Sequence, residues 1–148
     1  MRAPQRPLRR GDPCGTVTRE WQDGRVPTVY DCSDTASRAA GLDAARRALS
    51  SGRLVVMPTD TVYGIAADAF DSSAVAELLR AKGRGRDMPV PVLVGSWHTI
   101  DGLVLGVPQA ARDLIRAFWP GALSLVVHQA PSLAWDLGDA RGTVMLRM

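Results

Sequence analysis

The chain has 148 residues, 46% of them hydrophobic, which is enough for one compact domain with a buried core. Its formal net charge of +3 is set by the first ten residues, which hold arginines but no acid, so the remainder is close to neutral and gives no general argument for nucleic-acid binding. It has no run of about 18 apolar residues and no apolar segment after the N-terminal charges, so we expect neither a membrane span nor a secretory signal.

The cysteines and histidines form no metal or catalytic motif. Cys14 and Cys32 lack the spacing of a metal or redox site, and although a disulfide between them stays open, two cysteines are no disulfide framework. His98 and His128 fall on different predicted elements, without a carboxylate or cysteine at ligand spacing. We therefore expect a cytoplasmic protein with no metal held by its own side chains and no Ser–His–Asp triad.

The N-terminal segment differs in composition from the rest of the chain. Residues 1–26 are rich in Pro, Gly and Arg and lack hydrophobic periodicity, so we expect a disordered basic extension. Residues 27–148 contain no internal repeat and no linker, and we expect them to form one domain.

A short strand is predicted over residues 27–31 at the start of this domain. Ser33 or Asp34 can cap the helix that follows and continues to about residue 50. Gly52 lies just past its predicted end, where a left-handed residue terminates a helix.

The middle of the chain alternates strand-like and helical patterns. Apolar runs predict strands over 53–57, 61–67 and 90–94. An amphipathic stripe predicts a helix over 73–81, and a serine offers a cap for a short helix over 97–104.

The last elements complete an alternating order of strands and helices. Apolar residues at i, i+3, i+4 and i+7 predict a helix over 108–118, with Pro108 in its first turn. Strands are predicted over 122–128 and 143–147. This order favours an α/β or α+β domain built around a mixed sheet.

Two turns carry polar or rigid residues between predicted elements. PTDTVYG, residues 58–64, places hydroxyls and a carboxylate between two predicted strands, where small-molecule sites often lie. WPGALSL, residues 119–125, joins a helix to a strand through a rigid turn. Turn-forming residue types, and packing of Trp119 against Pro120, account for both segments without a ligand, and spacing alone favours that interpretation.

A basic segment, RAKGRGRD at residues 80–87, places four cations at alternate positions at the end of a predicted helix. Lys82 is the only lysine among 18 basic residues, and it follows Leu79 by three positions, so we predict that it lies toward the apolar face, where a cation needs an anion. The glycines allow close backbone approach, and the cations suit a phosphate-bearing substrate. A favourable interaction of these cations with the negative C-terminal end of the helix dipole would explain the same charges without a ligand. The sequence pattern of a P-loop is not present.

Four motifs in this order and spacing resemble one known family. They are PTDTVYG at 58–64, KGR at 82–84, WPGALSLV at 119–126 and TVMLRM at 143–148. Over about residues 31–148 the chain resembles the YrdC-like (TsaC-type) L-threonylcarbamoyladenylate synthases. The first three of these motifs are separate anchors, and together they make this resemblance specific.

The resemblance implies a twisted mixed β-sheet with flanking helices around a deep, positively lined cavity. It implies a nucleotidyltransferase that makes threonylcarbamoyl-AMP and pyrophosphate from L-threonine, bicarbonate and ATP, with Mg²⁺ accompanying the ATP. The adenylate would pass to a downstream tRNA threonylcarbamoyl transferase that modifies an adenosine beside the anticodon. Because such a cavity resembles a double-stranded RNA site, tRNA is a further expected partner.

The resemblance also implies roles for five residues of the motifs. Lys82 and Arg84 would be the catalytic cations that hold the phosphates and the carbamate. Ser124, which stands where the family usually has threonine, would line the nucleotide pocket. Thr59 and Thr61 would help to bind threonine.

The C-terminal motif both fits the family and departs from it. Arg147 would help to fix a carboxylate or phosphate. Met88 stands where the family often carries Lys or Asn. The family's domain continues into a Ser-x-Asn segment that lines the same cavity, and this chain stops at Met148, so we expect it to be an incomplete, N-terminal part of that domain.

Two alternatives to a synthase stay open. The arginines of residues 80–86, together with the basic extension, would also suit a non-catalytic RNA-binding module. The chain as it stands would otherwise be an inactive fragment of the synthase, marginally stable because a sheet strand at its end leaves an uncovered edge.

Overall fold

The computed structural model describes residues 27–148, so the disordered extension expected for residues 1–26 lies outside the described residues. The described residues divide between two units, the first ending at Arg46 and the second spanning Arg47–Met148, and the single domain expected over residues 27–148 stays a prediction. Within the described range, no helix has both the length and the apolar composition that a bilayer crossing needs.

The first helix, α1, spans Thr35–Leu49 and is capped at both ends as predicted. The carboxylate of Asp34 accepts a hydrogen bond from the backbone N–H of Ser37 at 2.7 Å. Gly52 follows the helix with a left-handed φ of 70°. The strand predicted over residues 27–31 is wrong, because a strand needs a hydrogen-bonded neighbour and these residues have none among the described strands.

The first two strands form an antiparallel hairpin. Strand β1 spans Val55–Met57, and β2 spans Gly64–Ala66. Each is shorter than its predicted segment. Strand β1 begins only at Val55, where pairing with Ala66 starts, and β2 begins only at Gly64, because the residues before it form the turn.

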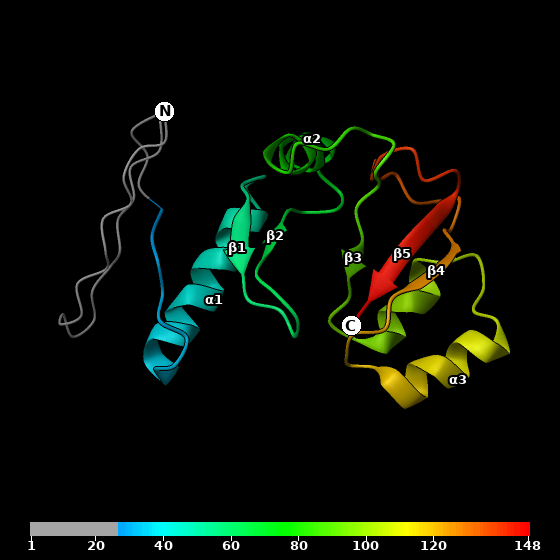
Figure 1. The fold of residues 1–148 in the computed structure, drawn as a ribbon, viewed down its shortest axis with the longest axis horizontal. Coiled ribbons are helices and arrows are strands. Elements are labelled where there is room, and N and C mark those ends of the chain that lie inside the picture. The colour runs from blue at the N-terminus through cyan, green and yellow to red at the C-terminus, as the bar shows by residue number, and fades with distance from the viewer. Residues whose placement is uncertain (1–26) are drawn as a thin grey trace, which may run out of the picture. The chain divides into compact units, whose positions relative to one another are not determined.

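The remaining three strands form a second, mixed sheet with the order β3-β5-β4. They span Val92–Leu93, Leu125–His128 and Thr143–Arg147 for β3, β4 and β5. The central strand, β5, runs parallel to β3 and antiparallel to β4 (Figure 1). Helices and a mixed sheet confirm the predicted fold class, although the five strands are divided between two sheets.

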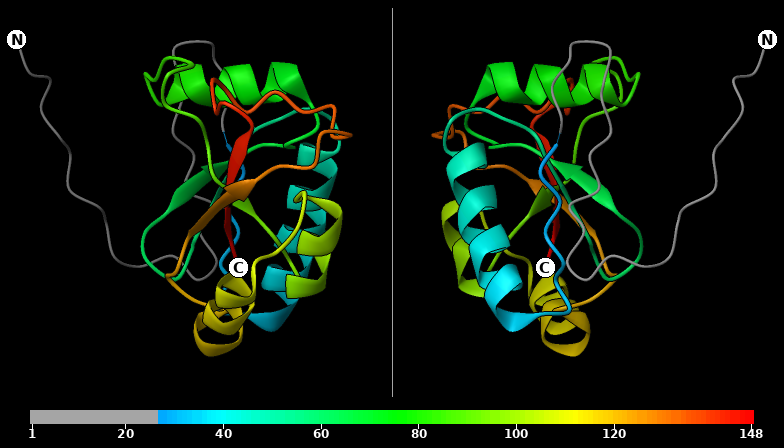
Figure 2. Two further views of the ribbon diagram at one scale, coloured as in Figure 1. Left: turned by 90° about the vertical axis from the view of Figure 1, so that its right-hand side faces the viewer. Right: turned by 90° about the vertical axis from the view of Figure 1, so that its left-hand side faces the viewer.

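Three helices complete the second unit. They are α2, Ser72–Ala81, the 3-10 helix η1, Trp97–Gly102, and α3, Gln109–Phe118. The side chains of Asp71 and Ser96 cap α2 and η1. Helices α2 and α3 lie toward opposite ends of β5 (Figures 1 and 2).

One hydrophobic core joins these helices to the three-stranded sheet. It takes its buried side chains from α2, η1, α3, β5 and the loops between them. Its members are Val75, Leu78, Leu79, Val90, Val94, Ile100, Leu103, Val104, Ile115, Trp135, Leu137, Val144 and Leu146.

The two faces of the three-stranded sheet differ in burial. On one face, Val144 and Leu146 of β5 enter the core and are only 2% and 1% exposed. On the other face, Leu93, Val126 and Met145, one from each strand, are exposed. Alternation along β5 therefore separates a packed face from an accessible apolar face.

We predict that Leu146→Ala lowers the free energy of unfolding by about 2–5 kcal/mol, because it leaves a cavity in the core. Urea denaturation followed by circular dichroism measures the change. The matched control is Leu93→Ala on the accessible face, for which we expect a loss below about 1 kcal/mol. Equal losses for the two variants would contradict the assignment of the faces.

Candidate functional site

The PTDT turn between β1 and β2 is held together by one hydroxyl. Oγ1 of Thr59 donates to the carbonyl oxygen of Val62 at 2.6 Å and accepts from the backbone N–H groups of Val62 at 3.2 Å and Thr61 at 3.3 Å. The hydroxyls of Thr59 and Thr61 lie 3.3 Å apart. The turn is thus a self-supporting loop that presents two neighbouring hydroxyl groups.

Asp60 of this turn pairs with Arg147 at the end of β5, across 87 positions of sequence. Nη2 of Arg147 contacts both carboxylate oxygens of Asp60 at 2.5 Å. The side chain of Arg147 is mostly buried. The backbone carbonyl oxygen of Arg147 accepts a hydrogen bond from the backbone N–H of Val94 at 2.9 Å. The structure therefore brings Thr59 and Thr61 near Arg147 through the residue between them.

Ser124 lies at the same end of β5. It immediately precedes β4, whose first residue, Leu125, pairs with Leu146. Continuing this antiparallel register by one residue places Ser124 opposite Arg147. Ser124 is exposed, so its hydroxyl is free to meet a ligand on this side of the sheet.

Lys82 and Arg84 lie in the loop that ends α2. Lys82 is the C-cap residue, Gly83 follows with a φ of 62°, and the backbone N–H of Arg84 donates to the carbonyl oxygen of Leu79 at 2.9 Å. Because the helix ends at this point, Lys82 is exposed, and the prediction that it lies on the apolar face is wrong. Within residues 27–148, neither cationic side chain has a hydrogen-bond or ion-pair partner.

The candidate residues thus form two clusters at opposite ends of β5. The loop after α2 lies beside the start of β5, and the β1–β2 turn lies toward its end (Figures 1 and 2). Lys82 and Arg84 therefore make no contact with the PTDT turn in this structure.

Arg84 lines an open cavity of about 500 Å³ beside α2. This volume is within the range of small-molecule sites. The lining combines helix residues, the loop arginines and one carboxylate: Ser72, Ser73, Val75, Ala76, Leu79, Arg80, Arg84, Gly85, Arg86 and Asp136.

Arg86, which the sequence grouped with the phosphate-binding cations, is paired with carboxylates. Its guanidinium donates to both oxygens of Asp136 at 2.9 and 2.8 Å and to Asp139 at 3.1 Å. This pairing raises the pKa of Arg86. Hydrogen bonds from Arg86 and from the backbone N–H of Gly138 lower the pKa of Asp136. The carboxylates lie 50 or more positions away, so no local sequence signal predicted this role for Arg86.

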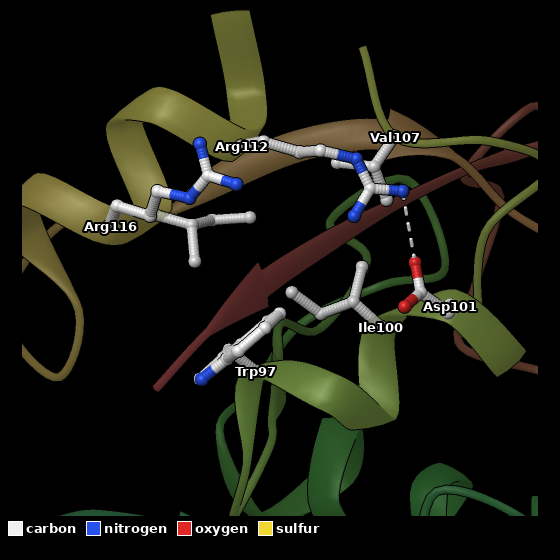
Figure 3. Close-up of a pocket in the computed structure, with 7 residues that line it drawn as sticks. Trp97, Ile100, Asp101, Val107, Arg112 and Arg116 are labelled. Carbon is white, nitrogen blue, oxygen red and sulfur yellow. Dashed lines mark hydrogen bonds and ion pairs between the residues drawn. The ribbon is translucent and has the colours of Figure 1, made fainter. Parts of the chain in front are cut away.

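A second hollow lies between η1 and α3 and is far smaller (Figure 3). Its volume of about 20 Å³ admits roughly one water molecule. Arg112 crosses it to donate to Asp101 at 3.2 Å, while Arg116 and Trp97 line its rim (Figure 3). A pocket of this size does not accept a nucleotide or an amino acid.

Residues 27–148 contain no group of three or more His, Cys, Asp or Glu side chains placed to hold a metal ion. His98 stacks on Trp97 with ring centroids 3.6 Å apart, and His128 is exposed at the end of β4. Cys32 is an exposed free thiol.

Comparisons with known sequences place this geometry in a family context. A family model named Sua5_yciO_yrdC, described as telomere recombination, matches residues 47–148. A Mycobacterium leprae protein, named provisionally as a threonylcarbamoyl-AMP synthase, is 73% identical over 124 residues, which make up 84% of this chain and 56% of that protein. The threonylcarbamoyl-AMP synthase of Pyrococcus abyssi is 36% identical over 100 residues, which make up 68% of this chain and 29% of that protein.

Solved structures resemble the fold as well. Sua5 of Pyrococcus abyssi, in a crystal structure complexed with L-threonine, aligns with a TM-score of 0.67 at 35% identity, covering 71% of this chain and 31% of that one. The solution structure of the MTH1692 protein from Methanobacterium thermoautotrophicum aligns with a TM-score of 0.60 at 28% identity, covering 72% and 51%. The present chain spans little more than half the length of its mycobacterial relative.

We predict that Asp60 and Arg147 stabilise each other by about 0.5–1 kcal/mol in a double-mutant cycle of Asp60→Ala and Arg147→Ala. The coupling should fall in 1 M salt. The control cycle uses Asp113 and Arg116, whose more exposed side chains should couple by less than about 0.5 kcal/mol. Absence of coupling between Asp60 and Arg147 would show that the turn is not held against β5.

Proposed function

Because this chain belongs to the Sua5_yciO_yrdC family, we propose that it carries part of the active site of a threonylcarbamoyl-AMP synthase. The substrates are L-threonine, bicarbonate and ATP, and the second product is pyrophosphate. The observation that supports this most strongly is the contact of the PTDT turn with Arg147, which groups hydroxyls and a guanidinium at one end of β5. The L-threonine complex of a relative with the same fold supports the choice of amino acid.

The turn and Arg147 form the threonine end of the proposed site. Only Nη2 of Arg147 is used by Asp60, so the other N–H groups of the guanidinium have no partner within residues 27–148. They are available to donate to the carboxylate of threonine. The hydroxyls of Thr59 and Thr61 would hydrogen-bond the polar groups of the same substrate.

Lys82 and Arg84 form the phosphate end. In-line attack at the α-phosphorus of ATP accumulates negative charge on the phosphate oxygens, and fixed cations stabilise it. Both side chains are exposed and have no partner within residues 27–148, so their donors are available to the phosphates. Ser124 lies at the other end of β5, opposite Arg147, and would hydrogen-bond a part of the nucleotide that extends away from the phosphates. Mg²⁺ would be held mainly by the ATP phosphates.

The proposed chemistry has two steps. The amino nitrogen of threonine bonds to the carbon of carbon dioxide derived from bicarbonate, and loss of a proton leaves a carbamate. A carbamate oxygen then forms a bond to the α-phosphorus of ATP, while the bond to the β-phosphate oxygen breaks and pyrophosphate leaves. The resulting adenylate serves a downstream tRNA threonylcarbamoyl transferase, which places the reaction in the cytoplasm.

We predict that Lys82→Ala abolishes pyrophosphate release that depends on both ATP and threonine, because the compact ammonium charge is lost from the phosphate site. A coupled pyrophosphate assay measures the rate. Arg116→Ala on α3 is the matched control, since it removes an exposed cation that belongs to neither of the two proposed clusters and should retain the wild-type rate. Retained activity in Lys82→Ala would rule out the assigned role.

The exposed cations of the loop after α2 also suit an RNA-binding module, and a salt titration separates the two functions. If RNA phosphates are the ligand, affinity for tRNA should fall steeply and linearly on a double-logarithmic plot as salt rises. The synthase proposal predicts pyrophosphate release whether or not tRNA binds. Absence of tRNA binding at low salt would remove the RNA-binding alternative.

A further inference from the structure

The loop that carries the two proposed phosphate-binding cations is tied to a distant segment by one side chain. Arg86 uses Nη1 and Nη2 for the two oxygens of Asp136 and Nε for Asp139. All three donor atoms of the guanidinium are therefore directed to the 136–139 segment. A planar fork can make such a set of bonds, whereas a single ammonium group cannot.

The backbones of the two segments also meet. The N–H of Asp139 donates to the carbonyl oxygen of Arg86 at 2.7 Å, and the N–H of Val90 donates to the carbonyl oxygen of Leu137 at 3.2 Å. Gly138 between them has a φ of 102°, and a Cβ at this position would lie 2.8 Å from the carbonyl oxygen of Arg86. Side chain and backbone together close the loop against the 136–139 segment.

The 136–139 segment is itself anchored in the core. Its neighbour Trp135 is 9% exposed and Leu137 is 4% exposed. The indole N–H of Trp135 donates to Gln129 at 3.0 Å, and its ring stacks on Phe70 at 5.5 Å. The residues 81–89 of the loop, by contrast, are all exposed. The anchored segment can therefore hold the exposed part of the loop, in addition to the buried Val90 at the end of the loop and the backbone hydrogen bond from Arg84 to Leu79.

The charge balance argues against Arg86 as a direct phosphate ligand. An anion that approached Arg86 would meet the carboxylates of Asp136 and Asp139, which already occupy its donors. The nearby cations Lys82 and Arg84 have no such partners within residues 27–148. The two kinds of cation in this loop therefore have different tasks.

We propose that Arg86 is a positioning residue, which locks the 82–90 loop to Asp136 and Asp139 so that Lys82 and Arg84 meet the phosphates in a fixed geometry. This assignment rests on the proposed function of Lys82 and Arg84. It predicts that Arg86 affects anion binding only through the order of the loop.

The test compares Arg86→Gln with the matched control Arg84→Gln in the full chain. Hydrogen exchange of the loop amides and titration with inorganic pyrophosphate are measured for both. Arg86→Gln should speed amide exchange in residues 83–88 and weaken pyrophosphate binding about 10- to 100-fold, the size of effect expected when a binding group is misplaced. Arg84→Gln should weaken binding without changing the exchange of the loop.

Further variants separate positioning from direct binding. Arg86→Lys should not restore slow amide exchange in the loop, because an ammonium group lacks the forked geometry of a guanidinium. In the double variant Arg86→Gln with Asp136→Asn, the loop amides should exchange no faster than in Arg86→Gln alone, since both changes break the same contact. Arg86→Gln should leave the salt dependence of the pyrophosphate affinity unchanged. Arg84→Gln should reduce that salt dependence, because only Arg84 is proposed to contact the phosphates.

Two results would overturn the proposal: unchanged loop exchange in Arg86→Gln, or faster exchange with unchanged pyrophosphate affinity. Failure of the proposed function would look different. In that case the wild-type chain would have an ordered loop but would not bind pyrophosphate at all.

Discussion

The structure depends on the central position of β5. This strand pairs with β3 on one side and β4 on the other, so its register fixes the entire three-stranded sheet. Its alternation sends Val144 and Leu146 into the core and leaves Met145 on the accessible face. A shift of one residue would turn the charged Arg147 toward the apolar core and expose the core side chains, so burial enforces the register.

Both candidate clusters take their positions from the ends of this strand. At its C-terminal end, Arg147 reaches Asp60 and thereby fixes the PTDT turn. Just before its N-terminal end, Asp136 and Asp139 hold Arg86 and the loop with Lys82 and Arg84. A substrate that joins an amino acid to a nucleotide has polar groups at more than one point, and β5 lies between the two clusters. This arrangement suits the proposed synthase, with carboxylate recognition at one cluster and phosphate recognition at the other.

Local patterns in the sequence predicted the elements well, and long-range contacts poorly. The strand over 143–147 was predicted with its observed bounds, since it is a short apolar run between two polar residues, Thr143 and Arg147. The strand over 27–31 was wrong because composition cannot tell whether a pairing partner exists. The motifs were sufficient to indicate the family. They could not reveal that Asp60 meets Arg147 or that Arg86 meets Asp136, since these pairs depend on how the chain folds back across 87 and 50 positions.

The most direct test of the account is to follow the backbone amide resonances of the chain during titration with a non-hydrolysable ATP analogue and, separately, with L-threonine. The account predicts that the ATP analogue shifts the resonances of residues 82–86 and that threonine shifts those of residues 59–61 and Arg147. Resonance changes confined to other parts of the chain, or the absence of any change with both ligands, would contradict the assignment of these two clusters to the two substrates.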